Sequence, residues 1–329
     1  GLKTEYLRKG GEEVKKILHL LVLLVAVHGS PYAKAYGWPV KPFDRPHPIQ
    51  GNFNDPRMST RKIDDANPKN EKHFHSGIDI TAPTGTPVYA IESGRARLIS
   101  GTAVSIRSSW GRFEYWHVNP VVWNGEMVKR HQLIGWVASR PGGKGGEHVH
   151  LSEWRGGRYV NPRRSGGIAP DPDAAPPVIQ FLMKETDRVI TRAEQENVLL
   201  VRGVVGLFVN VYDEPYMQPP RPWDHIRLSP TVVSWWLKTP EGKLVLKAKI
   251  VVDFRTTFWK TPLESIYGPG TIQNGPRVIG QYNLRLGRRW DTREIPDGIY
   301  VLVVQAADTG GNTVRKGFPI QIVNTSSSG

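Results

Sequence analysis

Short apolar runs separated by glycine and proline recur along most of the chain. Between residues 36 and 168, the runs that are bounded by turn residues and typical of β-strands are Ile78–Ile80, Pro87–Ile91, Arg97–Ile99 and Ala103–Ile106. Beyond residue 177, the candidates rich in β-branched and aromatic residues are Val198–Val211, Thr231–Leu237, Leu244–Phe254 and Tyr300–Gln305. With 34 glycines and 27 prolines among 329 residues, turns should be frequent and long helices scarce. The pattern predicts an all-β protein.

The chain is long enough for two domains, and its composition indicates where they meet. Residues 169–177 hold four prolines and no large apolar residue, which is typical of a stiff linker. We therefore predict one domain over 36–168, a second over 178–325 and a disordered tail over 326–329. Gly298–Asp308, a Thr-Gly-Gly-Asn turn and a return over Thr313–Val323 predict a β-hairpin. This hairpin resembles the last two strands of bacterial immunoglobulin-like or fibronectin-III-like modules, which implies a C-terminal immunoglobulin-like β-sandwich.

The amino-terminal segment indicates export. Lys15 and Lys16 precede an apolar run, Ile17–Val27, and Ala33-Lys34-Ala35 offers a small-residue cleavage site. These features predict a signal peptide over residues 1–35. An 11-residue helix rises only about 16 Å, less than the roughly 30 Å of a hydrocarbon core, although an uncleaved anchor remains an alternative. We expect no stable membrane span after cleavage, and a location in the cell wall, the periplasm or outside the cell.

The chain is strongly basic and contains no cysteine. Its formal charge is +14, and because residues 1–35 carry a net +3, the remainder carries +11. Such a charge concentrates a protein near polyanions. No nucleic-acid motif is present, so anionic cell-wall polymers are the better candidate partner for an exported protein, with a basic surface that has no specific partner as the alternative. Without cysteine, any metal ion must be bound by histidine and carboxylate.

Six of the ten histidines gather in one segment, and they are His73, His75, His117, His131, His148 and His150. For His19, His28, His47 and His225 we expect no site role. His75 and Asp79 stand four positions apart, with Gly77 between them to allow a close turn. His148-Val149-His150 would place both imidazoles on one face of a strand. Three such ligands and a water satisfy a catalytic zinc ion, yet bare motifs of this kind are as typical of surface histidines.

The surroundings of these motifs decide between the two interpretations. The run HSGIDITAPTGTPVYA over residues 75–90 resembles the signature of lysostaphin/LytM-type peptidoglycan endopeptidases. Tyr115-Trp116-His117, Val128–Gly135, His148–His150 and Val160–Pro162 resemble further family elements, in family order over roughly residues 50–164. The resemblance implies a LytM-type β-sandwich peptidase domain of the duplicated-hybrid-motif kind.

The resemblance also implies roles for individual residues. His75, Asp79 and His150 would bind one Zn²⁺ per peptidase domain. His117 and His148 would be catalytic, and we expect His148 to be the base and His117 to stabilise the developing oxyanion. Tyr115 would either support the site or be a packed aromatic residue.

Several positions depart from the family pattern. His131 replaces the usual glycine of a turn, Glu147 stands where proline is common, and Ser152 takes the place of a glutamate that is displaced to Glu153. His73 is a competing ligand candidate, and the segment Asn52–Arg57 resembles the family's FGxR only loosely. None of these changes removes a predicted ligand.

The resulting prediction is a secreted zinc metalloendopeptidase that hydrolyses stem or cross-bridge peptides of peptidoglycan. A non-catalytic LytM-like regulator or wall-binding protein is the alternative, but such proteins typically lack one or more ligands. An adhesion protein would leave the histidine set unexplained. The C-terminal domain would be a binding or spacer module.

Overall fold

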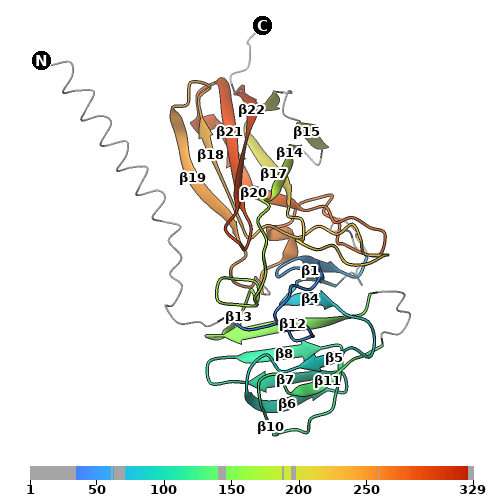
Figure 1. Ribbon diagram of the computed structural model, residues 1–329. Coiled ribbons are helices and arrows are strands. Elements are labelled where there is room, and N and C mark those ends of the chain that lie inside the picture. Colours follow the sequence, from blue (N-terminus) through green and yellow to red (C-terminus); the bar gives the residue numbers. More distant parts are fainter. Residues whose placement is uncertain are drawn as a thin grey trace, which may run out of the picture. The chain divides into compact units, whose positions relative to one another are not determined.

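Almost all of the regular structure is β-structure, as the sequence pattern predicts (Figure 1). The computed structural model describes residues 35–60, 62, 71–139, 146–186, 189–193, 198–258 and 260–324. In that part of the chain there are 22 strands and two short 3-10 helices, η1 (Leu263–Ser265) and η2 (Thr292–Glu294). The all-β fold class is confirmed.

Both predicted terminal segments fall outside this description. The predicted signal peptide, residues 1–35, has only Ala35 among the described residues, and the predicted tail, 326–329, has none. The chain from Ala35 onward clusters as one compact unit. Among the described residues, no helix has the length and apolar character needed to cross a membrane.

The first region is built on a sheet of eight strands and a sheet of three. In the larger sheet the order is β1-β4-β12-β8-β7-β6-β10, with β13 also paired to β12. These strands are β1 (Ile49–Gly51), β4 (Ile78–Thr81), β6 (Gly94–Ser100), β7 (Ala103–Arg107), β8 (Arg112–Trp116), β10 (Met127–Val128), β12 (His148–Arg155) and β13 (Arg158–Val160). The smaller sheet, in the order β5-β11-β9, contains β5 (Pro87–Tyr89), β9 (Val118–Pro120) and β11 (Leu133–Val137). A two-stranded ribbon joins β2 (Pro56–Met58) and β3 (Lys72–Phe74).

The antiparallel pair β4 and β12 positions the candidate site. Asp79 of β4 lies directly across from His150 of β12, and opposite residues of this kind have Cβ atoms only about 4.5–5.5 Å apart. Gly77 lets the chain enter β4 close to β12, since a Cβ atom at this position would lie 2.3 Å from the carbonyl oxygen of Leu151. The apolar residues of both strands, such as Ile78 and Leu151, are fully buried in the core of this region. Gly77, which the sequence predicted to allow a close turn, is therefore required because β12, the strand that carries His148 and His150, passes so close to it.

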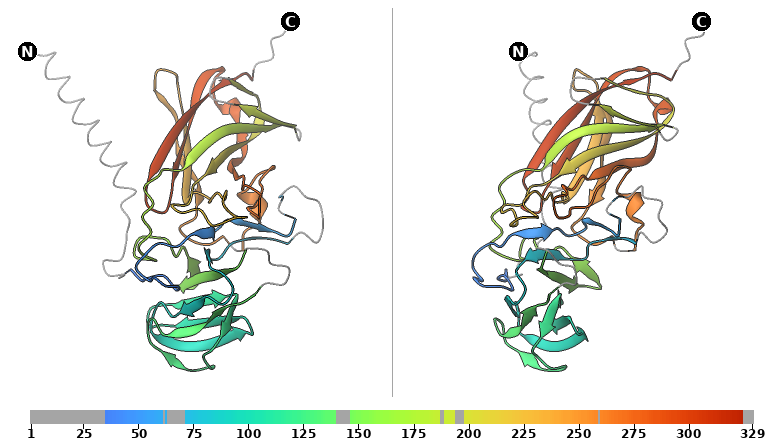
Figure 2. Two further views of the ribbon diagram at one scale, coloured as in Figure 1. Left: turned by 45° about the vertical axis from the view of Figure 1, so that its right-hand side comes forward. Right: turned by 90° about the vertical axis from the view of Figure 1, so that its right-hand side faces the viewer.

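The second region consists of two sheets that share one apolar core (Figure 2). One sheet, in the order β15-β14-β17-β20, contains β14 (Val178–Thr186), β15 (Val189–Ala193), β17 (Val204–Tyr212) and β20 (Asn283–Asp291). The other, in the order β16-β22-β21-β18-β19, contains β16 (Leu199–Val201), β18 (Val232–Lys238), β19 (Leu244–Asp253), β21 (Gly298–Ala307) and β22 (Thr313–Ile322). The predicted hairpin is confirmed as β21 and β22, paired from Gly298 opposite Ile322 to Ala307 opposite Thr313. The immunoglobulin-like character of this region stays a prediction.

One predicted strand is wrong. The run Val198–Val211 forms two strands, β16 and β17, which belong to different sheets. The break falls at Gly203, whose φ of +62° is a left-handed conformation that does not continue a strand. Leu199 and Val201 before the break and Val205 and Leu207 after it are buried in the shared core, which explains why hydrophobicity alone did not reveal the break.

Packing joins the two regions across the predicted linker. Met58 and Phe74, from the β2–β3 ribbon, are buried in the core of the second region. Conversely, Ile226 and Leu228 of the second region are buried in the core of the first. The predicted domain boundaries stay a prediction, but the two regions exchange side chains at both of these places.

Candidate metal centre

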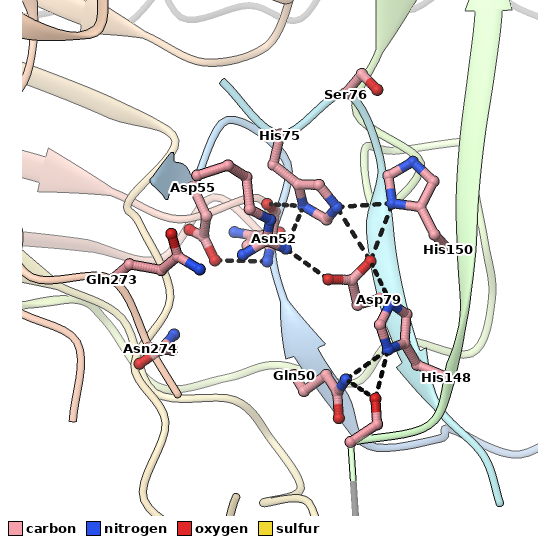
Figure 3. Close-up of polar contacts among 12 residues, drawn as sticks. Gln50, Asn52, Asp55, His75, Ser76, Asp79, His148, His150, Gln273 and Asn274 are labelled. Atoms are coloured by element: carbon pink, nitrogen blue, oxygen red, sulfur yellow. Dashed lines mark hydrogen bonds and ion pairs between the residues drawn. The ribbon is translucent and has the colours of Figure 1, made fainter. Parts of the chain in front are cut away.

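Three predicted ligands converge on one point. His75 Nε2 lies 3.0 Å from Asp79 Oδ1 and 2.7 Å from His150 Nδ1, and the last two atoms lie 2.9 Å apart (Figure 3). Ligands about 2.0–2.1 Å from one tetrahedral zinc ion would lie roughly 3.3 Å from each other, slightly more than these separations. His75 and Asp79 are buried, and His150 is partly buried. This group can bind a metal ion.

The outer hydrogen bonds of the two imidazoles determine which nitrogen faces this point. His75 Nδ1 lies 2.7 Å from the carbonyl oxygen of Asn52, which can only accept, so Nδ1 carries the proton and Nε2 offers a lone pair. His150 Nε2 lies 2.8 Å from Ser152 Oγ, and in the tautomer that donates to this hydroxyl, Nδ1 is the lone-pair atom. Two imidazole lone pairs and a carboxylate oxygen then meet without a donor among them. Such an arrangement calls for a cation.

Arg57 sets the orientation of the carboxylate. Its Nη2 lies 2.5 Å from Asp79 Oδ2, which leaves Oδ1 for the two imidazoles. The same Nη2 lies 3.0 Å from His75 Nδ1, but two nitrogens that both carry protons do not form a hydrogen bond, so the Asn52 carbonyl is the partner of Nδ1. Arg57 thus acts on the site through Asp79.

The electrostatics of the centre favour ligands in their metal-binding protonation states. Burial, and after it the nearby Arg57 guanidinium, lowers the pKa of His75 to about 3. Burial by itself raises the pKa of Asp79, yet the electrostatic interactions with His75, His148 and Arg57 hold that pKa well below its usual range. At neutral pH the centre therefore presents a neutral imidazole and an ionised carboxylate.

Two further histidines lie beside the ligands without belonging to the converging group. The rings of His117 and His148 are 4.7 Å apart, centre to centre, and nearly perpendicular. His148 Nδ1 lies 2.7 Å from the Gly146 carbonyl oxygen and therefore donates to it, so Nε2 remains the basic nitrogen. That Nε2 lies 3.4 Å from Asp79 Oδ1. His117 has a φ of +62°, a strained conformation for a residue with a side chain.

The centre lies in a groove with a volume of about 420 Å³. The residues lining it are Gln50, Arg57, His73, His75, Ser76, Asp79, Glu114, Trp116, His117, His148, His150, Tyr159, Trp223 and Gln273. The polar side chains outnumber the apolar ones, which suits a polar substrate with several hydrogen-bonding groups.

A family comparison accounts for this arrangement. The model of peptidase family M23 matches residues 73–162, the segment that contains all five predicted metal-binding and catalytic residues. Residues 73–162 form a peptidase M23 domain. No curated protein sequence matches the chain significantly.

Solved structures include several that are similar to part of the chain. The catalytic domain of lysostaphin, an antimicrobial peptidase from Staphylococcus simulans, is 28% identical over 24% of this chain and 66% of that chain, with a TM-score of 0.23. A variant of the catalytic domain of EnpA, a prophage-encoded M23 protein from Enterococcus faecalis, is 27% identical over 39% of this chain and 98% of that chain, with a TM-score of 0.29. A zinc-containing peptidase from Vibrio cholerae is 25% identical over 39% of each chain, with a TM-score of 0.30. The match thus spans less than two thirds of the first and the third of these chains.

The M23 domain brings the predicted site residues together. His75, Asp79, His117, His148 and His150 all line the groove, while their individual roles stay predictions. Tyr115 does not line it: its side chain is fully buried in the core, and its hydroxyl accepts a hydrogen bond from the backbone N–H of Ile91 at 3.0 Å. Of the two alternatives for Tyr115, the structure favours the packed aromatic residue.

The positions that depart from the family pattern have local explanations. His131 keeps the left-handed conformation, with a φ of +64°, and its ring stacks on Phe43 at a centre-to-centre distance of 3.9 Å. The Glu147 carboxylate accepts the backbone N–H of Gly146, the residue whose carbonyl oxygen accepts from His148. His73 lines the groove but does not belong to the converging group.

Sequence reasoning missed several groups that support the centre. Arg57, Gln50 and Ser152 received no role, although Ser152 stands two positions after His150 and so on the same face of β12. Glu153, the displaced glutamate, is fully buried and binds the guanidinium of Arg164 and the hydroxyl of Tyr36. Ser152, rather than Glu153, therefore contacts the predicted metal ligand His150.

A second group of carboxylates lies at the junction of the two regions. Oxygen atoms of Asp173, Asp213 and Asp308 lie within 4.8 Å of one another. The group contains no imidazole, and the buried Arg163 guanidinium lies 3.4 Å from Asp173. It therefore lacks the donor set of the first centre.

Proposed function

We propose that this protein is an exported zinc endopeptidase that hydrolyses peptide bonds in peptidoglycan stems or cross-bridges. The observation that carries the proposal is the convergence of three acceptor atoms, from His75, Asp79 and His150, in a groove that also holds two further histidines. The M23 domain supports peptidase activity. Zinc fits the donor set of two imidazoles and one carboxylate, because catalytic zinc sites use three such ligands and leave a fourth position open.

The residues around the centre support a division of roles. A zinc ion bound by the three ligands would polarise the scissile carbonyl group and lower the pKa of water. His148 is the proposed base, because its Nδ1 donates to the Gly146 carbonyl and leaves Nε2 to take a proton from the attacking water. His117, whose ring contacts that of His148, is proposed to stabilise the negative charge that develops on the substrate oxygen. Arg57, Asn52 and Ser152 hold the ligands in place.

Export, the wall as substrate and the immunoglobulin-like character of the second region belong to the same proposal. They rest on the basic amino-terminal segment with its apolar run, on the resemblance to wall peptidases and on the hairpin of β21 and β22. The net charge of +11 outside residues 1–35 supports contact with anionic wall polymers. A non-catalytic regulator is disfavoured because all three ligand positions and both neighbouring histidines are present.

The proposal is tested by digesting purified sacculi of several wall types with the full chain and identifying the released fragments by mass spectrometry. We expect new peptide termini, which should disappear with a chelator and with His150→Ala. Release of glycan fragments only, unaffected by the chelator and by the substitution, would refute the peptidase assignment.

A further inference from the structure

The groove wall is not made by the M23 domain alone. Two of the lining residues, Trp223 and Gln273, belong to the second region, more than 60 positions beyond the end of the family match. Both are partly buried, so each has one side against protein and one side available to the groove. A substrate that fills the groove will therefore contact the second region as well.

The side-chain amide of Gln273 is held in a defined orientation. Its Oε1 accepts the backbone N–H of Met58 at 2.5 Å, and only an oxygen can accept from this donor. The assignment leaves the amide nitrogen, with two N–H donors, on the other branch of the side chain. Within the described part of the chain, no group accepts from this nitrogen. Gln273 thus presents free donors at the groove wall.

The segment that leads into β2, the strand that Gln273 contacts, is fixed by other bonds from the second region. The buried Asp55 accepts the Ser229 backbone N–H at 2.9 Å and its hydroxyl at 2.7 Å. Tyr267 donates its hydroxyl to the Asn54 carbonyl oxygen at 2.9 Å. This part of the wall is therefore pre-organised, which lowers the entropic cost of a hydrogen bond to substrate.

Trp223 stands at a different point of the groove, next to the proposed base. A Cβ atom at Gly146 would lie 3.1 Å from the indole nitrogen of Trp223, so the ring packs directly on this glycine. The Gly146 carbonyl oxygen accepts from both His148 and Gln50. The second region therefore borders the groove both at the Arg57 strand and at the loop that orients His148.

We propose that Gln273 and Trp223 are specificity-determining residues of the peptidase groove, so that the second region completes the active site. The Gln273 amide donates to a main-chain carbonyl group of the bound peptide, and the Trp223 ring contacts the peptide beside His148. This inference rests on the proposed function, because it assigns the substrate contacts of the same site.

The test uses three variants of the full chain. Gln273→Glu keeps the acceptor for the Met58 N–H but removes both donors, whereas Gln273→Leu removes acceptor and donors together. Gln321→Ala, an exposed position of β22, is the control. Steady-state kinetics on a purified cross-linked muropeptide that the wild type cleaves, together with zinc content, are the measurements.

We expect both Gln273 variants to raise KM by about 3- to 10-fold, as for the loss of one hydrogen bond, while the control equals the wild type. Zinc content should remain unchanged for Gln273→Glu. A purely structural role for Gln273 predicts instead that Gln273→Glu keeps the wild-type KM and only Gln273→Leu is impaired. That result would overturn the inference while chelator-sensitive cleavage by the wild type still supported the proposed function. A zinc-loaded wild type that cleaves no wall peptide would overturn both.

Discussion

Replacing Ser152 by alanine removes one oxygen atom from the shell around the metal centre. The Ser152 side chain is fully buried, and its Oγ lies 2.8 Å from His150 Nε2. The other polar contact of Oγ, with Ser76 Oγ, is 3.5 Å long. After the substitution, the His150 ring would lose the hydrogen bond that orients it at Nε2.

The expected loss of zinc affinity follows from the position of the hydrogen bond between Ser152 and His150. Removal of a group that orients a metal ligand typically lowers metal affinity by about 10- to 100-fold, which corresponds to roughly 1.4–2.7 kcal/mol. All three ligands remain in Ser152→Ala, so the protein should still bind zinc, but more weakly. The backbone of β12 should be unaffected, since alanine fits where serine does.

Competition with a chromophoric zinc chelator measures this affinity in the full chain. Ser105→Ala is a matched control, because Ser105 is also buried, in β7 of the same sheet, and among the described residues its hydroxyl donates only to the Arg97 carbonyl oxygen, at 3.4 Å. We expect the control to bind zinc as the wild type does. Equal affinities for Ser152→Ala and the wild type would refute the claim that Ser152 orients His150 for metal binding.

Three further predictions concern catalysis, stability and pH. His148→Ala should lower kcat by about 10²- to 10⁴-fold with an unchanged zinc content, and a loss of zinc would show instead that His148 is a ligand. Ser229→Ala removes one donor from the buried Asp55 carboxylate, so urea denaturation should show a loss of about 1.5–3 kcal/mol in the free energy of unfolding, and an unchanged value would contradict a stabilising role for the Asp55–Ser229 hydrogen bond. Burial, with Asp173 and Asp308 nearby, raises the pKa of Asp213 to about 8. Between its ordinary value of 3.8 and about 8, the folded state holds a proton that the unfolded state has lost, so stability should fall as pH rises, by at most about 1.4 kcal/mol per pH unit. Asp213→Asn should flatten this slope in denaturation curves measured from pH 4 to pH 8, and equal slopes for both proteins would argue against it.

Local features of the sequence were sufficient to predict much of the fold and the centre. Alternation along a strand placed His148 and His150 on one face, and a glycine-rich turn between two apolar runs predicted the hairpin of β21 and β22. Both depend on residues that are close together in the chain. The split between β16 and β17 was missed because one glycine within an apolar run changes the backbone without changing the hydrophobicity.

The supporting groups could not be predicted in the same way, because their roles arise from long-range packing. Asp55 meets Ser229 from a position 174 residues away, and Met58 meets Gln273 from a position 215 residues away. Nothing near Gln273 in the sequence marks it as part of a peptidase groove. Such contacts exist only because the two regions exchange side chains between their cores, as Phe74 does.

The central claim is that one divalent ion is held jointly by residues far apart in the chain, and metal analysis of the purified full chain tests it most directly. After saturation with zinc and removal of the unbound ion, we predict one zinc per wild-type chain and less than a tenth of that for Asp79→Ala and His75→Ala. Full retention of zinc by both variants, or its absence from the folded wild type, would contradict the account.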